Sequence, residues 1–187
     1  IGDGSYAVGR WDGEVFVPGL IDEQRKLNLN VATPERLQRL IELSGAVDAD
    51  PAALAGAIVD WRDEPVGAAC ADAHPACHNG PLASVDELRL VPGMSAAVMA
   101  AIEPYVTVYG DGAVNVNTAS ALVLNAMGYP GDAMVEQRNT QPFTTHPELA
   151  VTSTVFTVPV EAQLQRSSPR SSLRAVVDRA GTILSWQ

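Results

Sequence analysis

The stretch that decides the fold is Gly80–Tyr109, GPLASVDELRLVPGMSAAVMAAIEPYVTVY. Ser84 and Glu87 have the spacing of a capping box, in which each side chain binds a backbone N–H that a helix start leaves unpaired. A Pro-Gly pair ends this short helix, because proline cannot continue it and glycine accepts the left-handed cap. Ser95 caps a second helix, and Tyr105–Tyr109 alternates like a strand. The stretch predicts a helix-hairpin-helix unit followed by a strand.

A second copy of this pattern follows along the chain. The segment Leu27–Thr33, LNLNVAT, recurs at Val114–Ser120 as VNVNTAS. Downstream, QPF at 141–143 matches GPL at 80–82, and Thr145 and Glu148 match the capping pair Ser84 and Glu87. The repeated segments begin 87 residues apart but the capping glutamates only 61, so the first copy is 26 residues longer. The sequence predicts an internal duplication of helix-hairpin-helix-like units.

Each repeated segment contains two asparagines, Asn28 and Asn30 in the first copy and Asn115 and Asn117 in the second. Asparagine side chains readily bind nearby backbone groups and so compete with regular secondary structure. We expect these pairs to tie strand ends to the helices that follow. Their duplication favours this structural role over a binding role.

Strands flank the helical part of the chain. Val15–Val17 and Lys26–Asn30 read as strands near the N-terminus, and helices are expected from Thr33 and from Asp50. From Ser153 onward three alternating segments predict a β meander. The fold class is therefore α+β, with a helical block at residues 33–150 inserted between strands at 1–32 and 151–187.

Composition and charge limit the classes of partner. The chain has 187 residues, 47% hydrophobic and 18% charged, with a net charge of −10. Such a surface repels a phosphate backbone, so nucleic acid is an unfavourable partner. No apolar run is long enough to span a bilayer. The chain opens at Ile1 without a methionine or signal peptide, which indicates processing or trimming, with an anchor removed upstream.

Two cysteines, Cys70 and Cys77, lie in a long loop with His74 and His78. A disulfide would indicate an oxidising compartment. Zinc bound by two Cys and two His is the alternative, although the spacing matches no common ligand pattern. Free thiols are the third possibility.

The candidate metal site is an acidic cluster of Asp60, Asp63 and Glu64, joined by Asp72 across the cysteine loop. Three carboxylates and loop carbonyls suit a hard cation, and calcium is the usual extracellular choice. The competing interpretation is a solvated helix end, since no EF-hand pattern is present.

No catalytic set stands out in the sequence. The chain lacks a Gly-x-Ser-x-Gly elbow, a phosphate loop and a His-Glu-x-x-His helix, so we predict that it is not an enzyme. An extracellular hydrolase is one alternative function. The other is a DNA-binding helix-hairpin-helix protein of the competence type, but the hairpin at Pro92 lacks a second glycine and few basic residues surround it.

The order of these motifs resembles the K-class minor pseudopilins of the type II secretion system. The resemblance covers nearly the whole chain. It rests on Asp22-Glu23 with KLNLN at 26–30, DWRD at 60–63, NGP at 79–81, SVDEL at 84–88, VPGM at 91–94, YVTVYG at 105–110, VNVNTA at 114–119 and the final LSW at 184–186.

The resemblance implies a pilin-like α+β domain with a large inserted helical domain, built on an N-terminal membrane helix that this sequence does not include. It also implies a place at the tip of the periplasmic pseudopilus, anchored in the bacterial inner membrane, in complex with I-class and J-class minor pseudopilins. Contacts with the outer-membrane secretin or with cargo are further expectations. The resemblance implies calcium and a disulfide, for which the acidic group Asp60, Asp63 and Glu64 and the pair Cys70/Cys77 are the matching features.

In that family the role is mechanical. A bulky insertion prevents further subunits from stacking above it, so the protein caps a filament and starts its assembly from the top.

Overall fold

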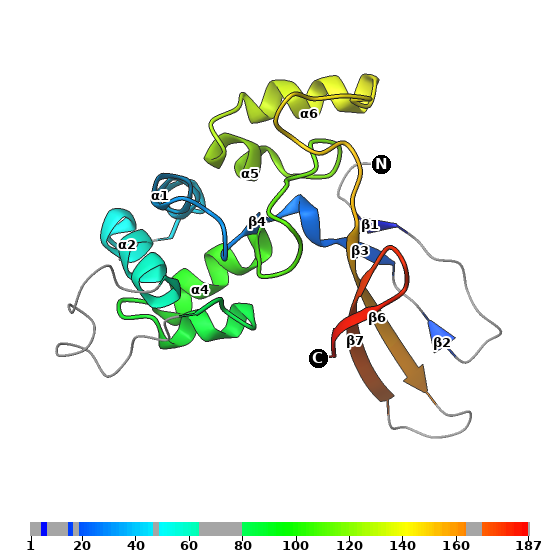
Figure 1. Cartoon of the computed structure of the whole chain (residues 1–187), viewed down its shortest axis with the longest axis horizontal. Coiled ribbons are helices and arrows are strands. Elements are labelled where there is room, and N and C mark those ends of the chain that lie inside the picture. The colour runs from blue at the N-terminus through cyan, green and yellow to red at the C-terminus, as the bar shows by residue number, and fades with distance from the viewer. Residues whose placement is uncertain are drawn as a thin grey trace.

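The structure is a computed structural model, and it describes residues 5–6, 15–16, 19–46, 49–63, 80–163 and 170–186. Figure 1 shows helices on one side of the molecule and a sheet on the other. The mixture of helices with an antiparallel sheet agrees with the predicted α+β class. Among the described residues, none of the helices combines the length and the apolar character needed to cross a membrane.

The sheet has six strands, in the order β1-β3-β6-β7-β8, and β2 pairs with β6 beside that path. All its pairings are antiparallel. The strands are β1 (Ser5–Tyr6), β2 (Val15–Phe16), β3 (Leu20–Asp22), β6 (Val155–Gln163), β7 (Arg170–Asp178) and β8 (Ile183–Trp186). The last three are the predicted meander, and they pair in one sheet with the N-terminal strands.

The helices lie between β3 and β6 in the sequence. The α-helices are α1 (Pro34–Leu43), α2 (Pro51–Arg62), α4 (Ala96–Ile102), α5 (Ala121–Ala126) and α6 (Gly131–Thr140). The 3-10 helices are η1 (Glu23–Arg25), η2 (Val85–Leu90) and η3 (Glu103–Tyr105), and β4 (Leu27–Asn28) pairs in parallel with β5 (Val106–Thr107).

The helix starts follow the predicted caps. Thr33 and Asp50 accept hydrogen bonds from the first-turn N–H groups of α1 and α2, each followed by proline at the first helical position. Ser95 and Ser120 do the same for α4 and α5 through the N–H groups of Val98 and Val123, both at 3.2 Å. These hydroxyls serve as caps.

Two hydrophobic clusters form the interior of the helical side. The first joins α1, α2, η2 and α4 and includes Leu29 and Leu88, both with no exposed surface. The second joins α5 and α6 with Val116 and Leu149. All buried members of both clusters come from residues 27–149, so the helical side has its own packed interior.

The predicted capping box of Ser84 and Glu87 is present at the start of η2. Glu87 Oε1 accepts from the N–H groups of Ala83 at 2.8 Å and Ser84 at 3.2 Å. The helix it begins is the 3-10 helix η2, however, and not an α-helix. The backbone of Leu82 is bound to Asn30 and Pro92 cannot continue a helix, so the stretch between them holds only a short helix of six residues.

The second predicted capping pair, Thr145 and Glu148, begins no helix, and that prediction was wrong. Two residues after Glu148 the backbone is already held in extended pairing, because Ala150 N–H donates to Val114 O and Val116 N–H donates to Ala150 O, both at 2.9 Å. We call residues 143–150 the strap. Its pairing leaves no length for a helical turn.

Two predicted strands are shorter than expected. Of Lys26–Asn30 only β4 is strand, because the backbone turns at Asn28, whose carbonyl accepts from Ala32 N–H at 2.9 Å. Of Tyr105–Tyr109 only β5 is strand, since η3 occupies its start. The turn at Gly110, where φ is 86°, leads into Val114–Ser120 and not into a second strand. We call Leu27–Thr33 and Val114–Ser120 the first and second Asn segments.

The contact between α5 and α6 depends on a glycine. A Cβ at Gly131 would lie 2.2 Å from the backbone oxygen of Ala121, which cannot move without shifting α5. We expect Gly131→Ala to lower the free energy of unfolding by about 2–3 kcal/mol, as overpacking against backbone does. Gly56→Ala is the matched control, because its Cβ meets nothing within 4 Å, and it should stabilise α2 slightly. Urea unfolding measures both, and equal effects would contradict the packing argument.

Candidate functional site

The site that joins the two halves of the molecule is a run of three buried polar residues at the end of β3. Asp22 has no exposed surface, and Glu23 and Gln24 are each 4% exposed. Buried polar groups are stable only when they are hydrogen-bonded, so each of these side chains needs specific partners. We call Asp22, Glu23 and Gln24 the junction.

Asp22 connects β3 to the second Asn segment. Its Oδ2 accepts from the Thr118 hydroxyl at 2.5 Å, from the Ser153 hydroxyl at 2.6 Å and from Asn115 Nδ2 at 3.4 Å. Its Oδ1 accepts from the N–H of Gln24 at 2.8 Å. One carboxylate thus holds the start of α5 and the chain entering β6 together.

Glu23 makes the corresponding connection to the first half. Its Oε2 accepts from the Thr107 hydroxyl of β5 at 2.6 Å, and its Oε1 accepts from the Thr157 hydroxyl of β6 at 2.7 Å. Lys26 Nζ donates to the same carboxylate at 3.1 Å and 3.2 Å. Glu23 therefore links the sheet to the β4–β5 pair beneath the helices.

Gln24 completes the junction. Its Oε1 accepts from the Thr154 N–H at 2.5 Å and from its hydroxyl at 3.0 Å. Its Nε2 donates to Asp111 Oδ1 and to the Ala113 carbonyl, both at 3.2 Å. The Gln24 carbonyl accepts from Asn115 N–H at 2.7 Å. Because the distant partners of the junction lie in two segments, at residues 107–118 and at residues 153–157, the junction sets the orientation of the helices against the sheet.

The two Asn segments have matching hydrogen bonds. The Oδ1 of Asn28 accepts from Asn30 N–H at 2.8 Å, and the Oδ1 of Asn115 accepts from Asn117 N–H at 2.9 Å. Asn30 exchanges two bonds with the backbone of Leu82, and Asn117 does the same with Phe143. The asparagines are therefore structural, as predicted, but Asn30 and Asn117 bind the distant backbone of Leu82 and Phe143 and not the helices that follow them.

An arginine closes each Asn segment. Arg62, the last residue of α2, donates through Nη1 to the carbonyls of Leu29 at 2.7 Å and Ala32 at 2.9 Å. Arg138 of α6 donates in the same way to Val116 at 2.9 Å and to Ala119. Burial, and next the charge of Arg25, lowers the pKa of Arg138. Arg62 thus holds the end of α2 against the segment that precedes α1, and Arg138 holds α6 against the segment that precedes α5.

The predicted metal residues are only partly within the described part of the chain. Asp60 and Asp63 lie at the end of α2 and are exposed. The Arg62 guanidinium donates to both oxygens of Asp63, at 2.6 Å and 3.0 Å, and this bonding holds the Asp63 pKa below its usual value. Glu64, Asp72, Cys70 and Cys77 lie outside the described residues.

The described residues hold no cluster of three or more His, Cys, Asp or Glu side chains suited to a metal ion. Asp60 and Asp63 supply oxygen donors, but a cation at Asp63 would have to share its carboxylate with Arg62. The calcium interpretation stays a prediction.

The hairpin between α5 and α6 bears on the DNA-binding alternative. The N–H of Gly128 donates to the Asn125 carbonyl at 3.0 Å, that of Tyr129 to the Leu124 carbonyl at 2.9 Å, and that of Gly131 to Asn125 Oδ1 at 2.8 Å. A phosphate-binding hairpin needs such N–H groups to face the nucleic acid. Here these three bind the chain's own oxygens, which disfavours that alternative.

Sequence reasoning missed most of the junction and both closing arginines. Asp22 and Glu23 were named only among the motifs that carry the family resemblance. Gln24, Arg62 and Arg138 were assigned no role. The available signal was a run of five polar residues, DEQRK at 22–26, between the apolar residues Ile21 and Leu27. A polar run there implies buried partners, but which partners depends on tertiary contacts.

The comparisons agree with this architecture. The family described as "Type II secretion system (T2SS), protein K" matches residues 20–111. No curated protein sequence matches the chain. A chain of the crystal structure of the GspK–GspI–GspJ complex from the enterotoxigenic Escherichia coli Type 2 Secretion System is similar, with a TM-score of 0.69 and 20% identity over 99% of this chain and 83% of that one. The family match over residues 20–111 and the shared fold support a type II secretion minor pseudopilin of the K class.

Proposed function

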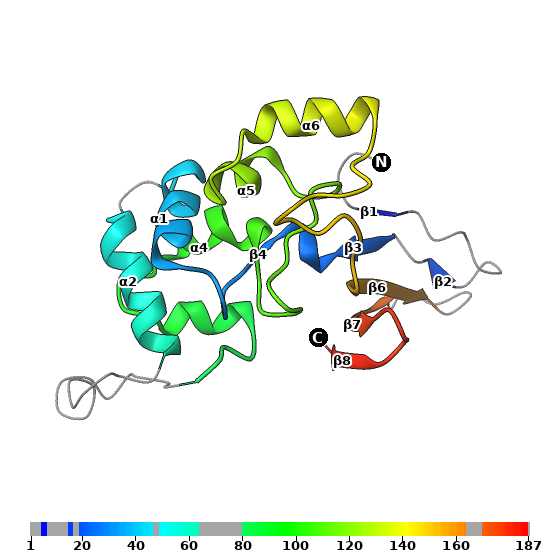
Figure 2. The same ribbon diagram turned by 45° about the horizontal axis from the view of Figure 1, so that its top comes forward.

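We propose that this protein is a non-enzymatic tip subunit of the type II secretion pseudopilus, which caps the filament and starts its assembly. The supporting observation is the fixed position of the helical side. Figure 2 shows the helices gathered beside the sheet, not wrapped around it. The junction holds them there through carboxylates that bind both halves. A rigid mass of this size next to a pilin-type sheet obstructs the stacking of another subunit above it.

The partners in this proposal are I-class and J-class minor pseudopilins. The similar solved structure is titled as a complex of GspK with GspI and GspJ. The periplasmic domains of I- and J-class proteins, mixed with this chain, should co-elute as one complex in size-exclusion chromatography with light scattering. A major pseudopilin domain is the control and should elute separately. Separate elution of all three candidate partners at micromolar concentration would refute the assignment.

Capping needs its own measurement. Pseudopili assembled with an epitope-tagged version of this protein should carry the label at one end only, as seen by immunogold electron microscopy. Label along the filament would show that the helical side does not block stacking, and the capping role would then be wrong even if the complex forms.

We further propose that the chain acts in the periplasm, held in the inner membrane by a helix encoded upstream of Ile1. Contacts with the secretin or with cargo belong to the same proposal. A basic leader, a processing site and an apolar helix in the upstream coding sequence would support the anchor, and a conventional cleaved signal peptide there would contradict it.

The two Asn segments with their helices are proposed to be duplicated helix-hairpin-helix-like units. Their equivalent asparagine bonds and closing arginines support this relation. In the second unit, however, the strap replaces η2 and α4. The prediction for Arg62 and Arg138 in the Discussion tests whether the two units behave alike.

Calcium binding by Asp60, Asp63, Glu64 and Asp72 is a separate prediction. Calcium should raise the midpoint of thermal unfolding, because a ligand that binds only the folded chain adds about 2.7 kcal/mol at a hundredfold excess over its Kd. The double variant Asp60→Asn/Asp63→Asn should lose this response, and Asp86→Asn, at an exposed carboxylate elsewhere, should keep it. An unchanged response in the double variant would remove these residues from the site.

A further inference from the structure

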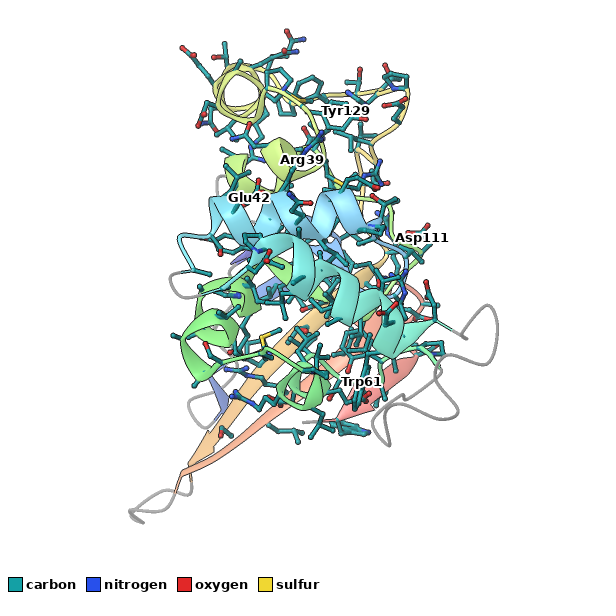
Figure 3. All side chains as sticks on the ribbon, turned by 90° about the vertical axis from the view of Figure 1, so that its left-hand side faces the viewer. Arg39, Glu42, Trp61, Asp111 and Tyr129 are labelled. Carbon is teal, nitrogen blue, oxygen red and sulfur yellow. The ribbon has the colours of Figure 1, made fainter. Side chains whose placement is uncertain are left out.

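A cavity of about 430 Å³ lies between the C-terminal end of α6 and the sheet. Arg138 of α6, Phe156 of β6 and Arg179, the residue after β7, all line it. In Figure 3, Tyr129 in the loop before α6 lies at the end of the helical side, above α1 and its residue Arg39. The volume is within the range of ligand pockets in proteins, about 300–1,000 Å³, so the cavity can hold side chains of a bound polypeptide.

Positive charge gathers at this cavity, although the chain as a whole has a net charge of −10. Arg138 is 6% exposed, and its Nη1 is held by the carbonyls of Val116 and Ala119. Arg179 lines the same cavity and is exposed. None of the ion pairs among the described residues involves Arg179. An anion in the cavity would therefore meet one buried guanidinium in a fixed position and a second one that faces solvent.

Arg25 of η1 adds to this positive potential. Burial, and next the charge of Arg25, lowers the pKa of Arg138, so the field of one guanidinium reaches the other. Arg138 still carries its charge at neutral pH, because arginine side chains are not deprotonated in proteins. The Asp22 carboxylate, bound to Asn115 and Ser153 of the cavity wall, offsets one of these charges. The remaining positive potential attracts an anionic group.

The other part of the wall is apolar and limits which anion fits. It is formed by Leu20, Pro142, Val151 and Phe156. A phosphate group has oxygens on every side, and those that face this wall would lose their hydrogen bonds. A carboxylate on an aliphatic stem has both oxygens on one side, where they suit a guanidinium, and apolar groups on the other. The cavity therefore favours an acidic side chain with apolar neighbours.

We propose that this cavity, which we call the arginine cavity, binds an acidic side chain of a partner polypeptide, with apolar residues of the partner against Leu20 and Phe156. The inference rests on the proposed function, in which I-class and J-class minor pseudopilins are the partners. Because Asn115 and Ser153 line the cavity and also bind Asp22, a partner held there lies at the joint between the helices and the sheet.

Peptide titration followed by NMR of the arginine Nε–Hε signals tests the class of ligand. The probe is the tripeptide Leu-Glu-Leu blocked at both ends, and Leu-Gln-Leu blocked in the same way is its uncharged counterpart. The Glu peptide should shift the signals of Arg138 and Arg179. The Gln peptide should bind about tenfold more weakly, because it lacks the charge-assisted hydrogen bonds. Equal binding of the two peptides would overturn the proposal.

A third peptide separates a side chain from a chain terminus. Leu-Gln-Leu with an unblocked carboxyl end offers its only carboxylate at the terminus, and it should bind more weakly than the Glu peptide. Tighter binding of this third peptide would overturn the assignment to a side chain.

Arg179→Gln should weaken the binding of the Glu peptide about tenfold, and it should weaken the complex with the I-class and J-class domains by a similar factor. Arg174→Gln is the matched control. It removes the same charge from an exposed arginine of β7, on the opposite face of the sheet from Phe156 in the β6–β7 register. Both affinities should stay unchanged in this control. Equal effects of the two variants would show that only net charge matters, and the proposal would be wrong.

The peptide experiment also separates this inference from the proposed function. If the I-class and J-class domains bind the chain but the Glu peptide leaves Arg179 unshifted, the arginine cavity is not a carboxylate site and the proposed function stands. If the Glu peptide binds as expected but no complex forms, the cavity keeps its ligand class and the proposed partners are wrong.

Discussion

Asp22→Ala should lower the free energy of unfolding by more than about 3 kcal/mol, one of the two largest effects that we expect from a single substitution in this chain. The change removes four hydrogen bonds and leaves the hydroxyls of Thr118 and Ser153 buried without their acceptor. Hydrogen bonds to charged groups contribute about 1.5–3 kcal/mol each, and a buried unpaired donor adds its own cost. Urea unfolding followed by circular dichroism gives the value.

Two further variants make this result specific. Asp22→Asn retains one oxygen acceptor and should cost roughly half as much. Asp86→Ala removes a carboxylate whose ion pair with Arg89 is exposed at both ends, and such pairs contribute less than about 1 kcal/mol. If Asp22→Ala were as mild as Asp86→Ala, the junction would not be what holds the helices to the sheet.

Arg138→Ala should destabilise the protein by about 2–4 kcal/mol. Arg138 is 6% exposed, and its loss leaves the carbonyls of Val116 and Ala119 without the guanidinium donor and opens a cavity at the end of α6. The chain offers an equivalent position, Arg62, whose truncation removes the same two kinds of bond from the first segment. We expect comparable losses at the two arginines, measured by thermal and urea unfolding.

Arg89→Ala is the matched control, because its side chain is 53% exposed and pairs only with Asp86 among the ion pairs of the described residues. It should change stability by less than about 0.5 kcal/mol. A near-neutral result at Arg138 with a large one at Arg62 would mean that the second unit is not closed as the first is, which would weaken the duplication proposal.

Local signals in the sequence predicted the helix starts well. Thr33-Pro34 and Asp50-Pro51 combine a side-chain acceptor with a residue that is preorganised for the first helical position, and both effects act within four residues. The three C-terminal strands were also predicted, from the alternation of apolar and polar residues along them. In both cases the deciding interactions are short-range.

Predictions failed where a distant segment competes for the backbone. Thr145 and Glu148 have the same spacing as Ser84 and Glu87, yet they begin no helix, because Val114 and Val116 capture Ala150 in extended pairing. A pattern of local spacing contains no information about such a competitor.

The sequence by itself determined the class of elements, the repeated Asn segments and the family to which the chain is similar. These depend on residue types and spacing, which act through backbone preferences and burial patterns of a few residues. Only the tertiary structure decided that Asp22, Glu23 and Gln24 form the junction and that Arg62 and Arg138 close the two segments. Those roles depend on partners up to 134 residues away, as for Glu23 and Thr157, and a buried polar group acquires its partner only when the chain has folded around it.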